Sequence, residues 1–171
     1  RKFGLCRGGA AAIAVLGVLA LPASASAQLV KAKDNRIVFG HLHIHPTNYD
    51  VHNKFWIDVL GGARGRVGTM DVALYLDGIM EWESPPWAGN PPAGGTKGSV
   101  VDHVAFGVTN LRATLDRVRA AGYPVITRAE LPPKDAKKEK NGIARSSELK
   151  APVAFVMGPD DFKVELIEVK K

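Results

Sequence analysis

The chain has 171 residues, 46% of them hydrophobic, and this size and composition predict one globular domain. Its formal net charge is +6, but no basic stripe interleaved with aromatic residues occurs, which argues against nucleic-acid binding. The single cysteine, Cys6, lies near the start, so neither a disulfide nor thiol chemistry is expected in the remainder.

The first 27 residues differ in character from the rest. Arg1, Lys2 and Arg7 give a basic start, an apolar run follows over residues 10–21, and small residues fill 23–27. This order predicts a signal peptide over 1–27, cleaved before Gln28. The apolar run is shorter than the ~20 residues that a membrane-spanning helix needs. We therefore expect a periplasmic or secreted protein of residues 28–171, with no membrane association after cleavage and a net charge near +3 once the three basic residues are removed.

The first predicted strand covers residues 36–45. Its period-two alternation places His41, His43 and His45 on one face and Leu42 and Ile44 on the other. Imidazoles this close together need hydrogen-bond partners, and their charged forms repel one another. The face therefore suits a metal or a polar substrate, and the alternative is a solvated face of an edge strand.

A helix and three strands are predicted next. Thr47 or Asn48 is the expected N-cap, apolar residues recur at helical spacing over 51–60, and Gly61 ends the helix. His52, on this helix, is expected at the surface. A short strand is predicted near 64–67, a clearer one over 72–76 and its returning partner over 79–83. Residues 85–99 are rich in proline and glycine and predict a linker.

After the linker the same pattern begins again. Residues 102–110 align without a gap on residues 40–48, which places His103 at the position of His41. A second helix follows, with Leu111, Leu115 and Val118 as its apolar stripe, and then strands over 153–157 and 163–169. A lysine-rich insertion around 134–150 is expected to be a solvated loop. The sequence thus predicts an α+β fold of two tandem βαβββ modules, at about 36–84 and 100–170.

Four residues hold equivalent places in the two modules: His41 and His103 on the first strands, and Glu81 and Glu165 on the last. A carboxylate on the inner face of a strand is costly unless it is paired or binds a metal. Two imidazoles and two carboxylates suit a divalent ion such as Fe, Mn, Ni, Co or Zn, with positions left open for a substrate. We predict these four residues as metal ligands.

The two modules differ at the positions of His43 and His45, where the second module has Ala105 and Gly107. This asymmetry makes His43 a candidate general base or acid. His45 is more simply read as a solvated residue at the rim.

These motifs resemble the vicinal oxygen chelate superfamily, which includes glyoxalase I, methylmalonyl-CoA epimerase, extradiol dioxygenases, fosfomycin-resistance enzymes and bleomycin-binding proteins. The resemblance covers residues 36–169 and is carried by residues 40–43, 55–62, 102–106 and 158–166. It implies a glyoxalase-like open barrel around a shared cavity, with metal ligands at His41, Glu81, His103 and Glu165. Without Glu81, the remaining three would resemble the two-histidine, one-carboxylate set of extradiol dioxygenases.

The resemblance implies an exported metal-dependent enzyme, either a glyoxalase-like lyase or isomerase or an extradiol-type dioxygenase. The metal would chelate two adjacent oxygens of a small substrate, and Glu165 or His43 would move the proton. One alternative is a non-catalytic small-molecule binding protein of the bleomycin-resistance type. Another is a cupin-like all-β site using His41 and His43, against which the two helical stripes argue. The cavity could form within one chain or across a homodimer.

Overall fold

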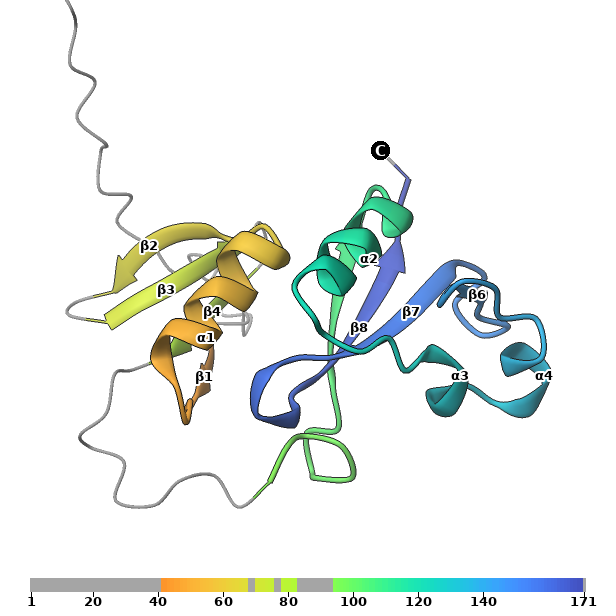
Figure 1. Cartoon of the computed structure of the whole chain (residues 1–171), viewed down its shortest axis with the longest axis horizontal. Coiled ribbons are helices and arrows are strands. Elements are labelled where there is room, and N and C mark those ends of the chain that lie inside the picture. The colour runs from red at the N-terminus through yellow and green to blue at the C-terminus, as the bar shows by residue number, and fades with distance from the viewer. Residues whose placement is uncertain (1–40, 68–69, 76–77, 83–93, 171) are drawn as a thin grey trace, which may run out of the picture.

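The computed structural model of the chain describes residues 41–67, 70–75, 78–82 and 94–170 (Figure 1). Side chains are described for all of these except residues 67, 70–71, 74–75 and 78–82. The predicted signal peptide over 1–27 lies outside the described residues, as does most of the predicted linker. Within the described ranges, no helix has the length and apolar character needed to cross a membrane.

The first half of the described chain forms a four-stranded sheet. Its strands are β1 (His41–Ile44), β2 (Ala63–Val67), β3 (Met70–Tyr75) and β4 (Gly78–Trp82), in the order β1-β4-β3-β2. β1 runs parallel to β4, and the other neighbours are antiparallel. The three later strands were all predicted, and their ends differ from the prediction by one or two residues.

The second half repeats this topology. β5 (Val104–Val108), β6 (Ala144–Arg145), β7 (Pro152–Met157) and β8 (Lys163–Glu168) lie in the order β5-β8-β7-β6. β5 is parallel to β8, as β1 is to β4. The first strand of each sheet therefore pairs with the last, and β8 lies inside its sheet although it is last in sequence. The predicted α+β class is confirmed.

The insertion of the second half is more ordered than the sequence predicted. A short helix, α3 (Thr127–Glu130), precedes the insertion, and instead of a solvated loop over 134–150 the chain forms α4 (Pro133–Ala136) and β6. Asp135 is buried, and its carboxylate accepts a hydrogen bond of 2.8 Å from the backbone N–H of Ser147. Hydrogen bonds to buried polar groups, such as this one, order the segment although its composition is polar.

The repeated asparagines cap the two main helices, α1 (Tyr49–Asn53) and α2 (Leu111–Ala120). The side-chain oxygen of Asn48 accepts from the N–H of Val51 at 3.2 Å, and that of Asn110 accepts from Ala113 at 3.0 Å. After the helices, Gly61 and Gly122 adopt φ values of +81° and +86°, which glycine tolerates.

The first helix differs from its prediction in one respect. It continues into a π-helix, η1 (Lys54–Val59), where Leu60 donates to the carbonyl of Phe55 at 3.0 Å. The sequence predicted an uninterrupted α-helix. Within this segment the adjacent side chains of Phe55 and Trp56 are both fully buried.

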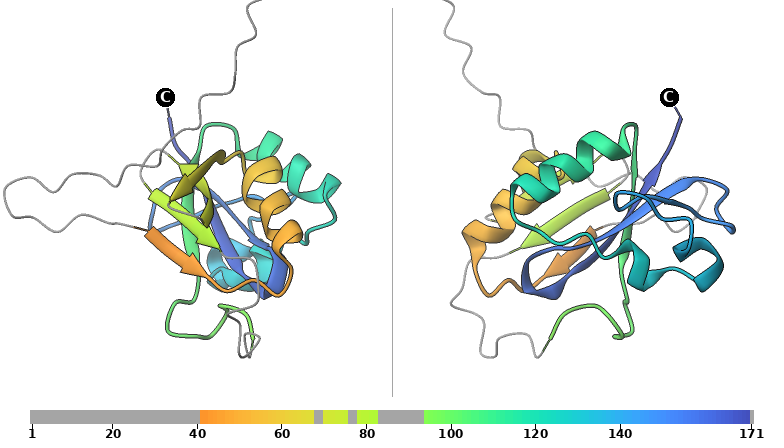
Figure 2. Two further views of the ribbon diagram at one scale, coloured as in Figure 1. Left: turned by 90° about the vertical axis from the view of Figure 1, so that its left-hand side faces the viewer. Right: turned by 45° about the vertical axis from the view of Figure 1, so that its right-hand side comes forward.

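The main core lies where the two helices run side by side (Figure 2). The Trp56 ring stands edge-on to Phe162 with centroids 5.2 Å apart, and Leu111 and Leu115 of α2 are fully buried. Burying a side chain of this size contributes roughly 1.5–3 kcal/mol. The guanidinium of Arg117 also donates to the carbonyl of Val59 at 3.1 Å. Helix packing therefore joins the two sheets.

His52 belongs to this core, so its predicted surface position is wrong. It is 2% exposed, and its Nε2 lies 2.9 Å from Oδ2 of Asp160 in η2 (Pro159–Asp161), the turn between β7 and β8. Trp56 donates to its Nδ1 at 3.1 Å. Because Nδ1 accepts, the neutral ring carries its proton on Nε2 and donates to Asp160. Asp160 also accepts from the backbone N–H of Thr47 at 2.7 Å and from the Thr47 hydroxyl.

Candidate metal site

The three histidines of the first strand follow one another along one face, as predicted. The ring centroids of His41 and His43 are 6.3 Å apart, and those of His43 and His45 are 5.3 Å apart. His41 and His45 are exposed and His43 is half-buried, whereas Ile44 points into the core. β1 itself ends at Ile44, so His45 lies just beyond the strand.

The backbone registers place the predicted carboxylates at matching positions. In the first sheet His43 is the partner of Glu81, and in the second Ala105 is the partner of Glu165. His41 and His103 each precede those first-strand residues by two. The side chain of Glu81 lies outside the described residues, so its ligand role stays a prediction.

His103 and Glu165 are brought together in the second sheet. His103 Nε2 lies 3.4 Å from Glu165 Oε2, and the two side chains are 35% and 12% exposed. Phe155, the β7 partner of Glu165, stands edge-on to the His103 ring with centroids 5.5 Å apart. An imidazole and a carboxylate therefore meet on a partly covered, partly apolar face.

The other nitrogen of His103 faces Asp102, a residue that the sequence analysis did not single out. Nδ1 lies 2.9 Å from Asp102 Oδ1, and Oδ2 of the same carboxylate accepts from the N–H of Gly98 at 2.8 Å. The bonds from Gly98, Lys163 and His103 hold the pKa of Asp102 well below its usual range. Asp102 is therefore an anion, and it accepts a hydrogen bond from the N–H at Nδ1.

Lys163 is the second residue that the sequence analysis missed. Its side chain is 5% exposed, and its ammonium contacts Asp102 Oδ1 and Glu130 Oε2, the latter at 2.8 Å. Burial alone would lower the pKa of Lys163, but the two carboxylates outweigh it and raise that pKa. The second oxygen of Glu130 lies 2.5 Å from Nζ of Lys97. Two carboxylates and two ammonium groups thus form a connected network beside His103.

The donor set on the second sheet fits half of a divalent-metal site. Imidazole nitrogen and carboxylate oxygen are ligands of Zn, Mn, Fe, Co and Ni, and a carboxylate on the far nitrogen is the usual support of a ligating histidine. Within the described part of the chain, no three His, Cys, Asp or Glu side chains lie close enough together to hold an ion. His41 does not join His103 and Glu165 in such a cluster, so its ligand role also stays a prediction.

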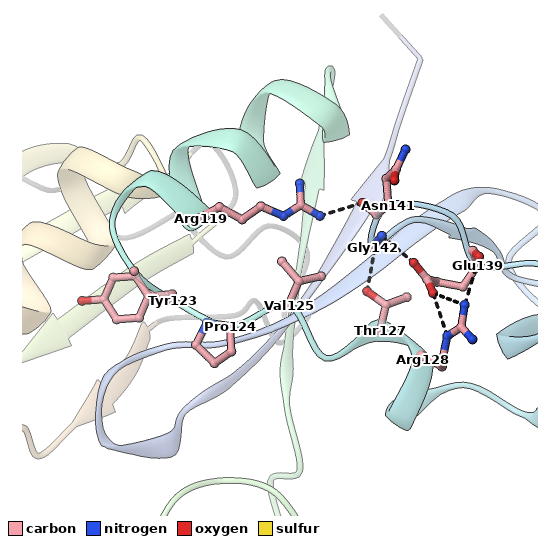
Figure 3. Close-up of a pocket in the computed structure, with 10 residues that line it drawn as sticks. Arg119, Tyr123, Pro124, Val125, Thr127, Arg128, Glu139, Asn141 and Gly142 are labelled. Atoms are coloured by element: carbon pink, nitrogen blue, oxygen red, sulfur yellow. Dashed lines mark hydrogen bonds and ion pairs between the residues drawn. The ribbon is translucent and has the colours of Figure 1, made fainter.

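A separate pocket of about 440 Å³ lies away from these residues, between the end of α2 and the insertion (Figure 3). Its polar groups are largely bonded to one another. Arg128 pairs with Glu139 at 2.8 Å, Thr127 donates to the carbonyl of Gly142 at 2.6 Å, and Arg119 donates to that of Asn141 at 2.6 Å. The first two bonds hold the insertion against α3 and the third holds it against α2, which is a structural role.

Comparisons with known proteins agree with this architecture. No protein-family profile matches the chain. A curated relative, a probable lactoylglutathione lyase of Vibrio cholerae, is 27% identical over 124 residues, which are 72% of this chain and 70% of that protein.

Similar solved structures come from several bacteria. The fosfomycin resistance protein FosX of Listeria monocytogenes has a TM-score of 0.52 at 12% identity, covering 75% of this chain and 88% of FosX. A lactoylglutathione lyase from Agrobacterium tumefaciens has a TM-score of 0.50 at 14% identity, covering 80% and 95%. An integron cassette protein of V. cholerae has a TM-score of 0.52 at 15% identity, covering 84% and 100%. At these identities the likeness concerns the fold.

Proposed function

We propose that the chain belongs to the vicinal oxygen chelate superfamily and is an exported, metal-dependent enzyme of the glyoxalase type, because its fold is like that of FosX and of lactoylglutathione lyase. Its substrate is a small molecule with two adjacent oxygen atoms. The proposal draws on the relationship to lactoylglutathione lyases and on the chemistry of the residues around His103.

The observation that carries the proposal is the arrangement of His103 between two carboxylates. Nδ1 donates to Asp102, so in the neutral ring the lone pair of Nε2 faces Oε2 of Glu165 at 3.4 Å. Two acceptors that face each other at this distance repel unless a proton or a metal ion lies between them. A divalent metal would bind both, and His41 and Glu81 are the proposed ligands from the first module.

When bound, the metal would supply Lewis-acid stabilisation of negative charge that develops on the substrate oxygens. The residues of the chain would provide the rest. Phe155 would exclude water from one side of the His103 ring, and Glu165 or His43 would hold the proton that moves during the reaction. His43 is half-buried between the rings of His41 and His45.

Metal analysis of the purified protein tests the proposal directly. We expect about one equivalent of a transition metal in the wild type and a large loss of metal in His103→Ala and Glu165→Gln. His45→Ala, which changes an exposed histidine outside the ligand set, is the matched control and should retain the metal. Absence of transition metal from every sample, even after incubation with Zn, Mn, Fe, Co or Ni, would overturn the enzyme proposal and favour a binding protein.

The reaction class is separated by two assays on the metal-loaded protein. Oxygen consumption with catechols would identify an extradiol-type dioxygenase. Turnover of the adduct of glutathione and methylglyoxal would identify lactoylglutathione lyase activity, which export makes less favourable because glutathione is chiefly cytosolic. Oxygen-independent turnover of another α-hydroxycarbonyl substrate would indicate a glyoxalase-like isomerase or lyase.

Export is a separate part of the proposal and rests on residues 1–27. The basic start, the apolar run and the small residues before Gln28 support cleavage at that point. N-terminal sequencing of protein recovered from the periplasm or medium should begin at Gln28. Recovery of uncleaved protein from the cytoplasm alone would contradict export without affecting the metal proposal.

A further inference from the structure

We propose that Asp102 and Lys163 are positioning residues that fix the tautomer of His103, so that its Nε2 is available to a metal. This inference rests on the proposed function, because it concerns how a proposed ligand is oriented. It gives a role to two residues that the sequence repeat did not single out.

Asp102 is held in one orientation by three donors. Oδ2 accepts from the N–H of Gly98 at 2.8 Å, and Oδ1 accepts from Nδ1 of His103 at 2.9 Å and from the Lys163 ammonium. A carboxylate has no proton to give, so Nδ1 must carry the proton. The tautomer of His103 is therefore set by the residue that precedes it in sequence, as happens where a carboxylate supports a ligating histidine.

Lys163 acts through Asp102. It lies two residues before Glu165 on β8, so both side chains project from the same face of the strand. Its ammonium is bonded to Asp102 and Glu130, and only 5% of its side chain is exposed, which leaves it poorly placed to contact a substrate. Its positive charge holds Oδ1 of Asp102 at the position where this oxygen accepts from Nδ1 of His103.

The network could instead serve only to hold α3 on β8, since Glu130 belongs to α3. Lys97 separates the two roles, because it is bonded to Glu130 at 2.5 Å but not to Asp102. Lys163→Met and Lys97→Met each remove one ammonium from the same network. Only the first removes one from Asp102.

The substitution Asp102→Ala gives a sharper prediction. It removes the acceptor opposite Nδ1 of His103, while the Lys163 ammonium keeps Glu130 as its partner. The acceptor that still faces the ring is Oε2 of Glu165, 3.4 Å from Nε2, and it favours the reversed tautomer, with the proton on Nε2. The reversed ring presents an N–H to Glu165 and no lone pair to a metal.

The test uses the full-length protein, with ¹⁵N NMR of the His103 ring in the metal-free state at pH 8 and zinc titration of each variant. We expect the proton on Nδ1 in the wild type and in Lys97→Met, and on Nε2 in Asp102→Ala. Zinc affinity should fall by about 10–100-fold in Asp102→Ala and by several-fold in Lys163→Met, and should be unchanged in Lys97→Met. Circular dichroism checks that each variant is folded.

Each outcome has one meaning. An unchanged tautomer and unchanged zinc affinity in folded Asp102→Ala would overturn the inference. If Asp102→Ala does not fold, equal zinc affinities in Lys163→Met and Lys97→Met would overturn it instead. If the wild type binds no metal but the tautomer still reverses in Asp102→Ala, the proposed function fails while the positioning role stands.

Discussion

The buried His52 makes the stability of this protein depend on pH in a defined direction. Its pKa is lowered from 6.5 because burial disfavours the charged ring, an effect that its bond to Asp160 only partly offsets. Protonation would also set a ring N–H against the N–H of Trp56, which now donates to Nδ1. The folded state therefore keeps the ring neutral at a pH where the unfolded chain binds a proton.

The size and sign of the effect follow from this difference. Well above pH 6.5 the ring is neutral in both the folded and the unfolded state, and its contribution to the free energy of unfolding is complete. As the pH falls below that value, the unfolded state gains a proton first, so the free energy of unfolding decreases, with a limiting slope of about 1.4 kcal/mol per pH unit. Between pH 6.5 and 5.5 the loss amounts to as much as ~1 kcal/mol while the folded ring stays neutral.

Urea unfolding at pH 7.5, 6.5 and 5.5 measures this loss. His52→Gln is the informative variant, because its amide can still bond to Trp56 and Asp160 but does not titrate. The wild type should lose up to ~1 kcal/mol more than His52→Gln between pH 6.5 and 5.5. His45→Gln, at an exposed site, should follow the wild type. Parallel pH dependences of the wild type and His52→Gln would refute the reasoning.

Three further substitutions test the fold by urea unfolding. Asp160→Asn removes a charged acceptor that both Thr47 and His52 contact, and it should lower the free energy of unfolding by about 1–3 kcal/mol. Asp161→Asn, at an exposed site with a similar φ of +53°, is the control and should lower it little. Equal losses would mean that the contacts of Asp160 do not stabilise the fold. Gly142→Ala places a Cβ 2.7 Å from Val125, whereas the Cβ of Gly122→Ala meets no atom within 4 Å. The first substitution should therefore lower the free energy of unfolding by at least ~1 kcal/mol more than the second. Similar losses would refute the steric argument. Leu115→Ala, at a fully buried site, should cost about 2–5 kcal/mol, and a loss below ~1 kcal/mol would mean that this core is loosely packed.

The parts of the fold that depend on local chemistry could be predicted from the sequence. Asn48 and Asn110 recur at the same place in the repeat, and each caps a helix because its side chain satisfies a backbone N–H nearby. Gly61 and Gly122 end those helices for an equally local reason. The strands followed from apolar runs between turn residues.

Elements held by distant contacts could not be predicted in this way. β6 has two residues and no pattern of its own, and Asp135 becomes buried only because the N–H of Ser147 reaches it. His52 looked like a surface residue because nothing near it in sequence reveals Asp160, which is 108 positions away. A polar residue with a remote partner is indistinguishable in sequence from one that faces solvent.

The candidate site falls between these cases. The repeat identified His103 and Glu165, which the structure brings together at 3.4 Å. One sequence signal could also have identified Asp102, since the first module has Gly40 at the equivalent position and therefore lacks an Asp-His pair. Lys163 had no such signal, because its partners Asp102 and Glu130 lie far away in the chain.

The place of β8 between β5 and β7 has a consequence for the order in which a newly made chain can fold. β5 and β7 leave the ribosome before β8. Until β8 emerges, the edge of each strand that pairs with β8 is exposed and can pair with strands of other chains. Release of residues 163–168 closes both edges at once and brings Lys163 to Asp102 and Glu165 to His103 in the same step. Synthesis that stalls before residue 163 would leave a chain with neither a closed second sheet nor a paired His103, and such chains are expected substrates for chaperones and proteases.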